Sequence, residues 1–251
     1  MTLLTDLVGA LASGDHRVVD LTQPLSERTP VLQLPDPLAN TPGLSRREIS
    51  RYDDRGPAWA WDVLEVGEHV GTHFDAPIHW ITGRDGEDVA SVPAARLVGP
   101  AVVIDKSAEA AEDPNYLLTA DDIRAFEAEH GDLPDGAWVL LRTGWDTRAH
   151  DQDEFLNGGA TPGPDAECAR LLAHERPIAG FGVETVGTDA GMAHSFDPPF
   201  PVHNFLLGAG KYGITQLANL AELPPVGAVI VVAPLKLVNG TGSPSRVLAL
   251  V

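Results

Sequence analysis

The chain of 251 residues has a single cysteine, Cys168, which excludes an intrachain disulfide and a thiolate metal site. The residues around it, 166–172, predict a helix, so we interpret Cys168 as a buried structural thiol. The sequence also lacks a basic N-terminal stretch followed by a long apolar run, and it has no run of about 18 apolar residues. It therefore predicts neither a signal peptide nor a membrane span, and we expect a cytoplasmic protein.

Basic residues are scarce: 17 lysines and arginines face 36 aspartates and glutamates, which gives a net charge of −19. This balance argues against nucleic acid and against anionic membrane surfaces as partners. Hydrophobic residues make up 43% of the chain and aromatic residues 6%, as in an ordinary globular protein. The length is ample for a buried core, and we expect one domain covering residues 1–251.

Three of the nine histidines fall in one short segment, residues 69–79. His69, His73 and His79 share it with Asp75. Imidazole and carboxylate groups are suited to a divalent first-row metal ion. The sequence therefore predicts a metal site here, and the alternative is a histidine-rich surface loop.

The spacing of these residues requires the chain to bend. In a straight strand His69 and Asp75 would lie about 20 Å apart, too far to share an ion. In a straight helix Asp75 would point about 120° away from His73. Gly71 allows a bend, and Pro77 prevents a regular helix from continuing. We therefore expect a strand to end near residue 66 and the ligands to converge from the turn that follows.

The remaining pattern predicts an α/β fold with a mixed sheet in a single domain. Residues 24–58 are rich in proline and show little periodicity, so we expect a long irregular excursion. We expect a helical turn near 202–207. The pattern predicts strands near residues 17–22, 59–66, 97–105, 137–142, 177–183, 226–234 and 246–250, and helices near 1–13, 119–130 and 164–175.

Residues 69–79 read His-Val-Gly-Thr-His-Phe-Asp-Ala-Pro-Ile-His. This segment resembles the His-x-Gly-Thr-His-x-Asp-x-Pro-x-His signature of the cyclase family of metal-dependent hydrolases, which includes bacterial kynurenine formamidases and isatin hydrolases. Further resemblance lies in residues 20–24, 182–189, 203–208 and 217–224. The resemblance implies a swivelling β/β/α fold that assembles as a homo-oligomer, a dimer or larger.

One position separates the branches of this family. Kynurenine formamidase-like members carry a glutamate where this chain has Gln216, and that glutamate helps to hold a second metal. The run Thr-Gln-Leu-Ala-Asn-Leu around Gln216 resembles isatin hydrolases instead. The resemblance implies one divalent metal per chain, Mn²⁺ favoured and Zn²⁺ the alternative, held by His69, His73, Asp75 and Gln216. The alternative for Gln216 is a surface amide with no role.

The resemblance and the ligand chemistry together predict a metal-dependent hydrolase that opens a small cyclic amide, an isatin-like lactam. A metal-bound water would attack the carbonyl, with His79 as general base and acid. The alternatives for His79 are a fourth metal ligand and a core histidine. For His203 we expect a role as a second proton carrier, a hydrogen-bond donor or a ligand of a second metal.

Aromatic residues close in sequence to these positions predict an apolar slot for a flat ring. We expect the substrate to contact Trp59, Trp61, Trp80 and Phe200; the alternative is that most of the nearby aromatic residues belong to the core.

Three other functions remain open. They are hydrolysis of N-formylkynurenine, hydrolysis of another small lactone or amide, and non-catalytic binding of a metal or ligand. A two-metal phosphodiesterase is disfavoured, because Asp75 is the only carboxylate between His69 and His79 and no glycine-rich phosphate loop precedes a helix.

Overall fold

The structure is a computed structural model that describes residues 2–251. Its main sheet has eight strands in the order β1 (Val18–Asp20), β12 (Gly242–Leu250), β11 (Ala228–Pro234), β5 (Val98–Asp105), β7 (Trp138–Arg142), β9 (Gly180–Val183), β10 (Tyr212–Thr215) and β4 (His73–Asp75). β5, β7, β9 and β10 are parallel, whereas the other pairings are antiparallel. β4 also pairs with β12, so the sheet closes on itself. The predicted mixed α/β fold is confirmed.

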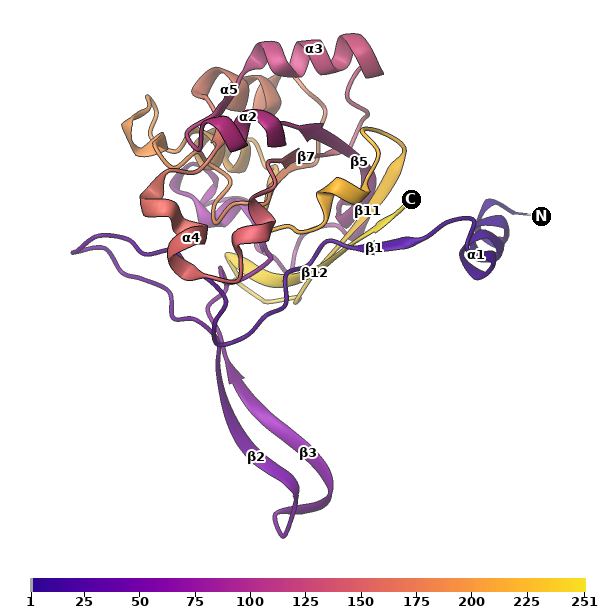
Figure 1. The fold of residues 1–251 in the computed structure, drawn as a ribbon, viewed down its shortest axis with the longest axis vertical. Coiled ribbons are helices and arrows are strands. Elements are labelled where there is room, and N and C mark those ends of the chain that lie inside the picture. Colours follow the sequence, from indigo (N-terminus) through magenta and orange to yellow (C-terminus); the bar gives the residue numbers. More distant parts are fainter. Residues whose placement is uncertain (1) are drawn as a thin grey trace.

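The sheet is buried on both faces. Successive side chains of its central strands point alternately into two apolar clusters. Trp138 and Leu140 of β7 join the cluster inside the closed sheet, with Phe74 and Tyr212. Val139 and Leu141 of the same strand face the second cluster, which packs against the helices α3 (Ala120–His130) and α5 (Ala166–His174). Figure 1 shows these helices together on one side of the sheet.

The caps of these helices follow from the sequence. Thr119 accepts a hydrogen bond from Asp122 N, and the Asp122 carboxylate accepts one from Thr119 N, which completes a capping box. Asp165 caps α5 by accepting from Cys168 N at 2.7 Å, and Cys168 is buried as expected. The predicted helices near 119–130 and 164–175 are confirmed, although Pro164 itself belongs to a short strand.

Two segments extend from the body in Figure 1: the helix α1 (Leu3–Ser13) and the hairpin of β2 (Ser45–Asp53) and β3 (Gly56–Glu65). The expected irregular excursion over residues 24–58 is wrong in its second half, which forms β2. Neither face of this strand packs on the core, so the sequence Ser-Arg-Arg-Glu-Ile-Ser-Arg-Tyr-Asp shows no apolar alternation. None of the described helices is long and apolar enough to cross a bilayer. A cytoplasmic location stays a prediction.

The smaller elements lie in the connections. They are α2 (Ser107–Glu112), β6 (Leu117–Leu118), α4 (Gln152–Leu156) and β8 (Gly163–Pro164), and β6 pairs with β8. The predicted helical turn near 202–207 is a π-helical turn, His203–Leu207.

The carboxyl ends of β7 and β9 are joined by one buried side chain, Glu184, which is 1% exposed. Its Oε2 accepts hydrogen bonds from the backbone N–H groups of Thr143, Gly144 and Trp145 at 2.7, 2.6 and 3.2 Å. Burial and the negative charge of Asp146 raise the pKa of Glu184 to about 7, although these backbone donors act in the opposite direction. Glu184 thus holds the turn after β7 against the end of β9.

This raised pKa predicts how stability depends on pH. The ordinary pKa is 4.5, so between pH 4.5 and about 7 the folded chain keeps a proton on Glu184 that the unfolded chain has lost. Stability therefore falls as pH rises through this window, by up to about 3 kcal/mol. Glu184→Gln, which cannot ionise, should lose this component. Urea denaturation at pH 5 and pH 8 measures it, with the exposed Glu112→Gln as control. An equal pH dependence in Glu184→Gln and the wild type would contradict the assignment.

Candidate metal and catalytic site

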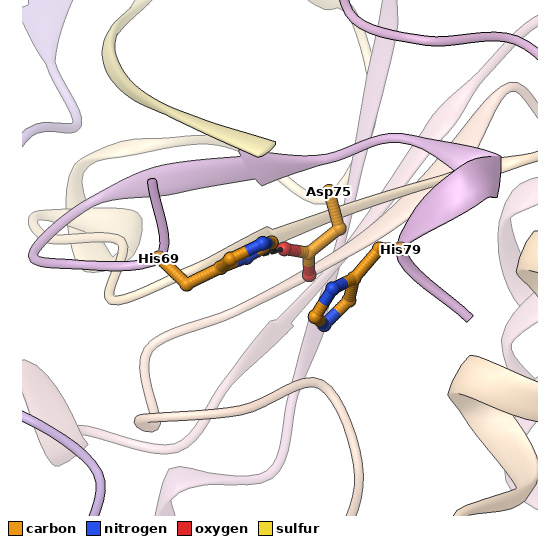
Figure 2. Close-up of side chains that lie close together, drawn as sticks. All are labelled: His69, Asp75 and His79. Carbon is orange, nitrogen blue, oxygen red and sulfur yellow. Dashed lines mark hydrogen bonds and ion pairs between the residues drawn. The ribbon is translucent and has the colours of Figure 1, made fainter. Parts of the chain in front are cut away.

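The histidine-rich segment wraps around the short strand β4. His73 and Asp75 point to the same face of β4, because residues two apart in a strand share a face. His69 lies in the loop before β4, and His79 in a 3₁₀ turn after it (Figure 2). Gly71 has φ +66°, so the predicted bend at this glycine is confirmed.

Three side chains of this segment come together around Asp75. His69, Asp75 and His79 each offer one donor atom, and these atoms lie within 4.8 Å of one another. The His69 Nδ1–H donates to Asp75 Oδ1 at 2.8 Å, and the rings of His69 and His79 stack with centroids 3.9 Å apart. Figure 2 shows both rings beside the Asp75 carboxylate.

His73 lies deeper, at 5% exposure. Its Nδ1 is 2.7 Å from Gly71 O, and its Nε2 is 3.2 Å from Thr215 Oγ1 and 3.5 Å from Asp75 Oδ1. The donor group, whose atoms lie within 4.8 Å of one another, is thus His69, Asp75 and His79. The predicted ligand set contained His73 in place of His79. The assignment of His69, His73, Asp75 and Gln216 as ligands stays a prediction.

The protonation states of these groups suit a metal ion. Burial raises the pKa of Asp75, but the charges of His73, His69 and His79 outweigh it and hold the pKa below its usual value. Burial lowers the pKa of His73 to about 4 and that of His79 to about 3, against the attraction of Asp75. At neutral pH Asp75 is therefore ionised and His73 and His79 are neutral, the forms that bind metals.

Gln216 carries a buried oxygen that has no partner. Its side chain is 1% exposed, and its Nε2 donates to Pro30 O at 3.3 Å, whereas Oε1 accepts no hydrogen bond in the described chain. An unpaired buried carbonyl oxygen is unfavourable unless a ligand fills the gap. An amide oxygen is a ligand type that a divalent ion accepts alongside imidazole nitrogens and a carboxylate.

His203 approaches the cluster from the π-helical turn. Its ring centroid lies 5.5 Å from that of His79 and 4.8 Å from that of Trp80. Its Nδ1–H donates to Asp189 Oδ2 at 2.5 Å. Burial lowers the pKa of His203, but the hydrogen bond and charge of Asp189 outweigh burial, so the pKa is raised.

The four aromatic residues expected to bind substrate separate into two pairs. Trp80 and Phe200 pack edge to face, with centroids 5.7 Å apart, beside His203. Trp59 and Trp61 lie on β3, in the hairpin that points away from the body, and are 49% and 56% exposed.

Sequence reasoning missed three residues that support the site: Glu68, Asp189 and Thr241. Thr241 Oγ1 lies 2.9 Å from His69 Nε2 and donates to Glu68 Oε2 at 2.5 Å. No sequence signal marks Thr241, because the pairing of β12 with β4 brings it to His69 from far along the chain. Asp189 belongs to the 182–189 segment of the family resemblance, which was the available signal.

Comparisons with known proteins agree with this architecture. The family model described as "Putative cyclase" matches residues 19–190. The isatin hydrolase of Roseibium aggregatum is 49% identical over 99% of this chain and 97% of that protein. The kynurenine formamidase of Salinibacter ruber is 30% identical over 73% of this chain and 76% of that protein. The structure of isatin hydrolase A from Ralstonia solanacearum has a TM-score of 0.96 and 48% identity, covering 100% of this chain and 98% of that one.

Gly242 gives a test of the donor group. A Cβ at this residue would lie 2.4 Å from His69 Cε1 and 2.7 Å from Phe74 O, so Gly242→Ala should displace His69. We expect affinity for Mn²⁺ or Zn²⁺ to fall by about 10–100-fold, as when a residue supporting a ligand is lost. Calorimetric titration measures this, with circular dichroism to monitor the fold. Gly187→Ala, which adds its methyl group in open space, is the control. Unchanged affinity in Gly242→Ala would place the metal away from His69.

Proposed function

The chain belongs to the cyclase family, and on that basis we propose that it is a metal-dependent hydrolase that opens a small cyclic amide of the isatin type. The observation that carries the proposal is the cluster of His69, His79 and the ionised, buried Asp75, beside which His73 and His79 are neutral. The full-length similarity to an isatin hydrolase supports the choice of substrate class.

The reaction adds water across the C–N bond of the ring. The water oxygen bonds to the carbonyl carbon, the C–N bond breaks with its electron pair left on nitrogen, and nitrogen takes a proton. A bound divalent ion would supply activation of the water and polarisation of the carbonyl. We propose His79 as the base that removes the proton from water. Both of its ring nitrogens lack a hydrogen-bond partner in the described chain, so they are free to contact water or substrate.

We propose one divalent ion per chain, Mn²⁺ favoured and Zn²⁺ the alternative, held by His69, His73, Asp75 and Gln216. The amide of Gln216 supports one ion rather than two, because a neutral oxygen does not offset the repulsion between neighbouring cations. His79 is the alternative ligand, since its ring lies within reach of the same donor group.

The partly exposed rings of Trp80 and Phe200 support a flat aromatic substrate. They lie beside His203, so a ring packed against them would lie next to the metal cluster. A cyclic amide differs from a simple hydrocarbon ring because its carbonyl group can also accept hydrogen bonds in the site.

The purified chain should consume isatin in the presence of Mn²⁺ or Zn²⁺, followed by the loss of isatin absorbance. Elemental analysis of the same preparation should give about one ion per chain. His79→Gln should keep the metal and lose turnover by about 100-fold or more. Turnover of N-formylkynurenine without turnover of isatin would assign the formamidase activity instead. A ratio near two ions per chain would contradict the role given to Gln216, and loss of metal in His79→Gln would make His79 a ligand.

We also propose that the protein is a homo-oligomer in which the β2–β3 hairpin contacts a second copy. Trp59 and Trp61 lie on this hairpin, away from the body of their own chain. If they contact substrate, they must do so in the site of another copy. The strongly negative chain and the absence of a membrane-spanning helix among the described residues favour a protein partner.

Trp61→Glu should therefore lower the mass of the assembly. Light scattering should give a multiple of the 26.6 kDa chain mass for the wild type and a smaller value for the variant. The control is Val238→Glu, which places the same charge at another exposed apolar residue, 79% exposed, outside the hairpin. A wild-type mass of one chain, or no change in Trp61→Glu, would contradict the hairpin contact.

A further inference from the structure

Asp189 makes three hydrogen bonds at the beginning of the π-helical turn, although the predicted mechanism gives it no role. Its Oδ1 accepts from Val202 N at 2.7 Å, and its Oδ2 accepts from His203 N at 3.2 Å and from His203 Nδ1 at 2.5 Å. The side chain is buried, at 7% exposure. One carboxylate therefore fixes both the backbone and the imidazole of His203.

This contact determines which nitrogen of His203 can react. Nδ1–H is bonded to Asp189, with Thr188 Oγ1 at 3.4 Å from the same nitrogen. Nε2 has no hydrogen-bond partner in the described chain, and it is not sealed in the interior. The ring packs against Trp80, and His79 is the next ring. Nε2 is thus the only nitrogen of His203 available to a ligand beside His79.

The two histidines differ in how they are held. His79 stacks on His69 and has no hydrogen-bonded group that fixes its tautomer. His203 has the arrangement of an oriented acid–base histidine, in which a buried carboxylate holds one ring nitrogen while the other carries the proton. A second metal on His203 is disfavoured, because the family resemblance gives the neutral Gln216 where a two-metal site would need a carboxylate.

We propose that Asp189 is a positioning residue that holds His203 so that its Nε2–H delivers a proton to the leaving nitrogen of the cyclic amide. This inference rests on the proposed function. His79 takes one proton from water as the C–O bond forms. When the C–N bond breaks, the nitrogen keeps the electron pair and takes the Nε2 proton of His203. The new carboxylic acid loses its remaining proton to solvent, and the proton on His79 returns through solvent to His203.

A double-mutant cycle tests the proposal, with Asp189→Asn, His203→Gln, the double variant and the wild type loaded with the same metal. Asparagine keeps the shape of the cap but cannot hold Nδ1–H as a carboxylate does. We expect Asp189→Asn to lower kcat by about 10–100-fold and His203→Gln by about 100-fold, with KM nearly unchanged. The double variant should match His203→Gln alone, because Asp189 acts through His203.

The matched control is Asp165→Asn. Asp165 also accepts a backbone hydrogen bond as a helix cap, to Cys168 N, but it lies in the α5 cap outside the site. It should lower the melting temperature and leave kcat unchanged. Additive losses in the cycle, a normal kcat in Asp189→Asn, or loss of metal in His203→Gln would each overturn the proposal.

A second readout does not depend on turnover. In ¹⁵N spectra of the zinc-loaded chain, recorded at a pH high enough to remove the Nε2 proton, the neutral His203 ring should keep its single proton on Nδ1 in the wild type. Asp189→Asn should shift that proton toward Nε2. Unchanged His203 signals in Asp189→Asn would also overturn the proposal. A wild type that opens no cyclic amide contradicts the proposed function and the proton delivery with it. An active wild type with an equally active Asp189→Asn contradicts only the inference about Asp189.

Discussion

The site depends on the pairing of β4 at both of its edges. Three residues, His73–Asp75, pair with Thr215–Gly213 of β10 on one side and with Pro244–Gly242 of β12 on the other. This closes the sheet and brings Gln216 and Thr241, from far along the chain, to the histidine-rich segment. A short strand is weak alone, so the position of Asp75 is set by its two neighbours rather than by local sequence.

Asp75 is the electrostatic centre of this arrangement. Burial disfavours its charge, but the surrounding imidazoles hold its pKa low. Burial in turn keeps His73 and His79 neutral. The ionised Asp75 carboxylate is thus a buried negative charge, which a cation can neutralise. The wider acidic surface, with a net charge of −19, is a separate feature that bears on partners rather than on this site.

The sequence was sufficient for the elements whose signals are local. The helix near 119–130, the bend at Gly71 and the strand β5 each follow from a few adjacent residues. The hairpin strand β2 was missed because neither of its faces packs on the core, so it has no apolar alternation. The contact of Thr241 with His69 was missed because it depends on strand pairing between distant segments. The choice between His73 and His79 in the donor group also depends on side-chain positions, which spacing alone does not set.

Two unfavourable features coincide at Gln216: a left-handed backbone conformation and a buried side-chain oxygen without a hydrogen-bond partner. Its φ of +54° lies in the left-handed region, which costs a non-glycine residue about 1 kcal/mol or more. Its backbone is nevertheless fixed on both sides: the N–H donates to Thr185 O at 3.0 Å, and the C=O accepts from Thr72 Oγ1 at 2.6 Å. This backbone directs the side chain inward, where Oε1 has no partner. Strain and an unpaired buried oxygen at the same residue are both offset if the oxygen binds a cation, and this supports the proposal that Gln216 completes the metal site.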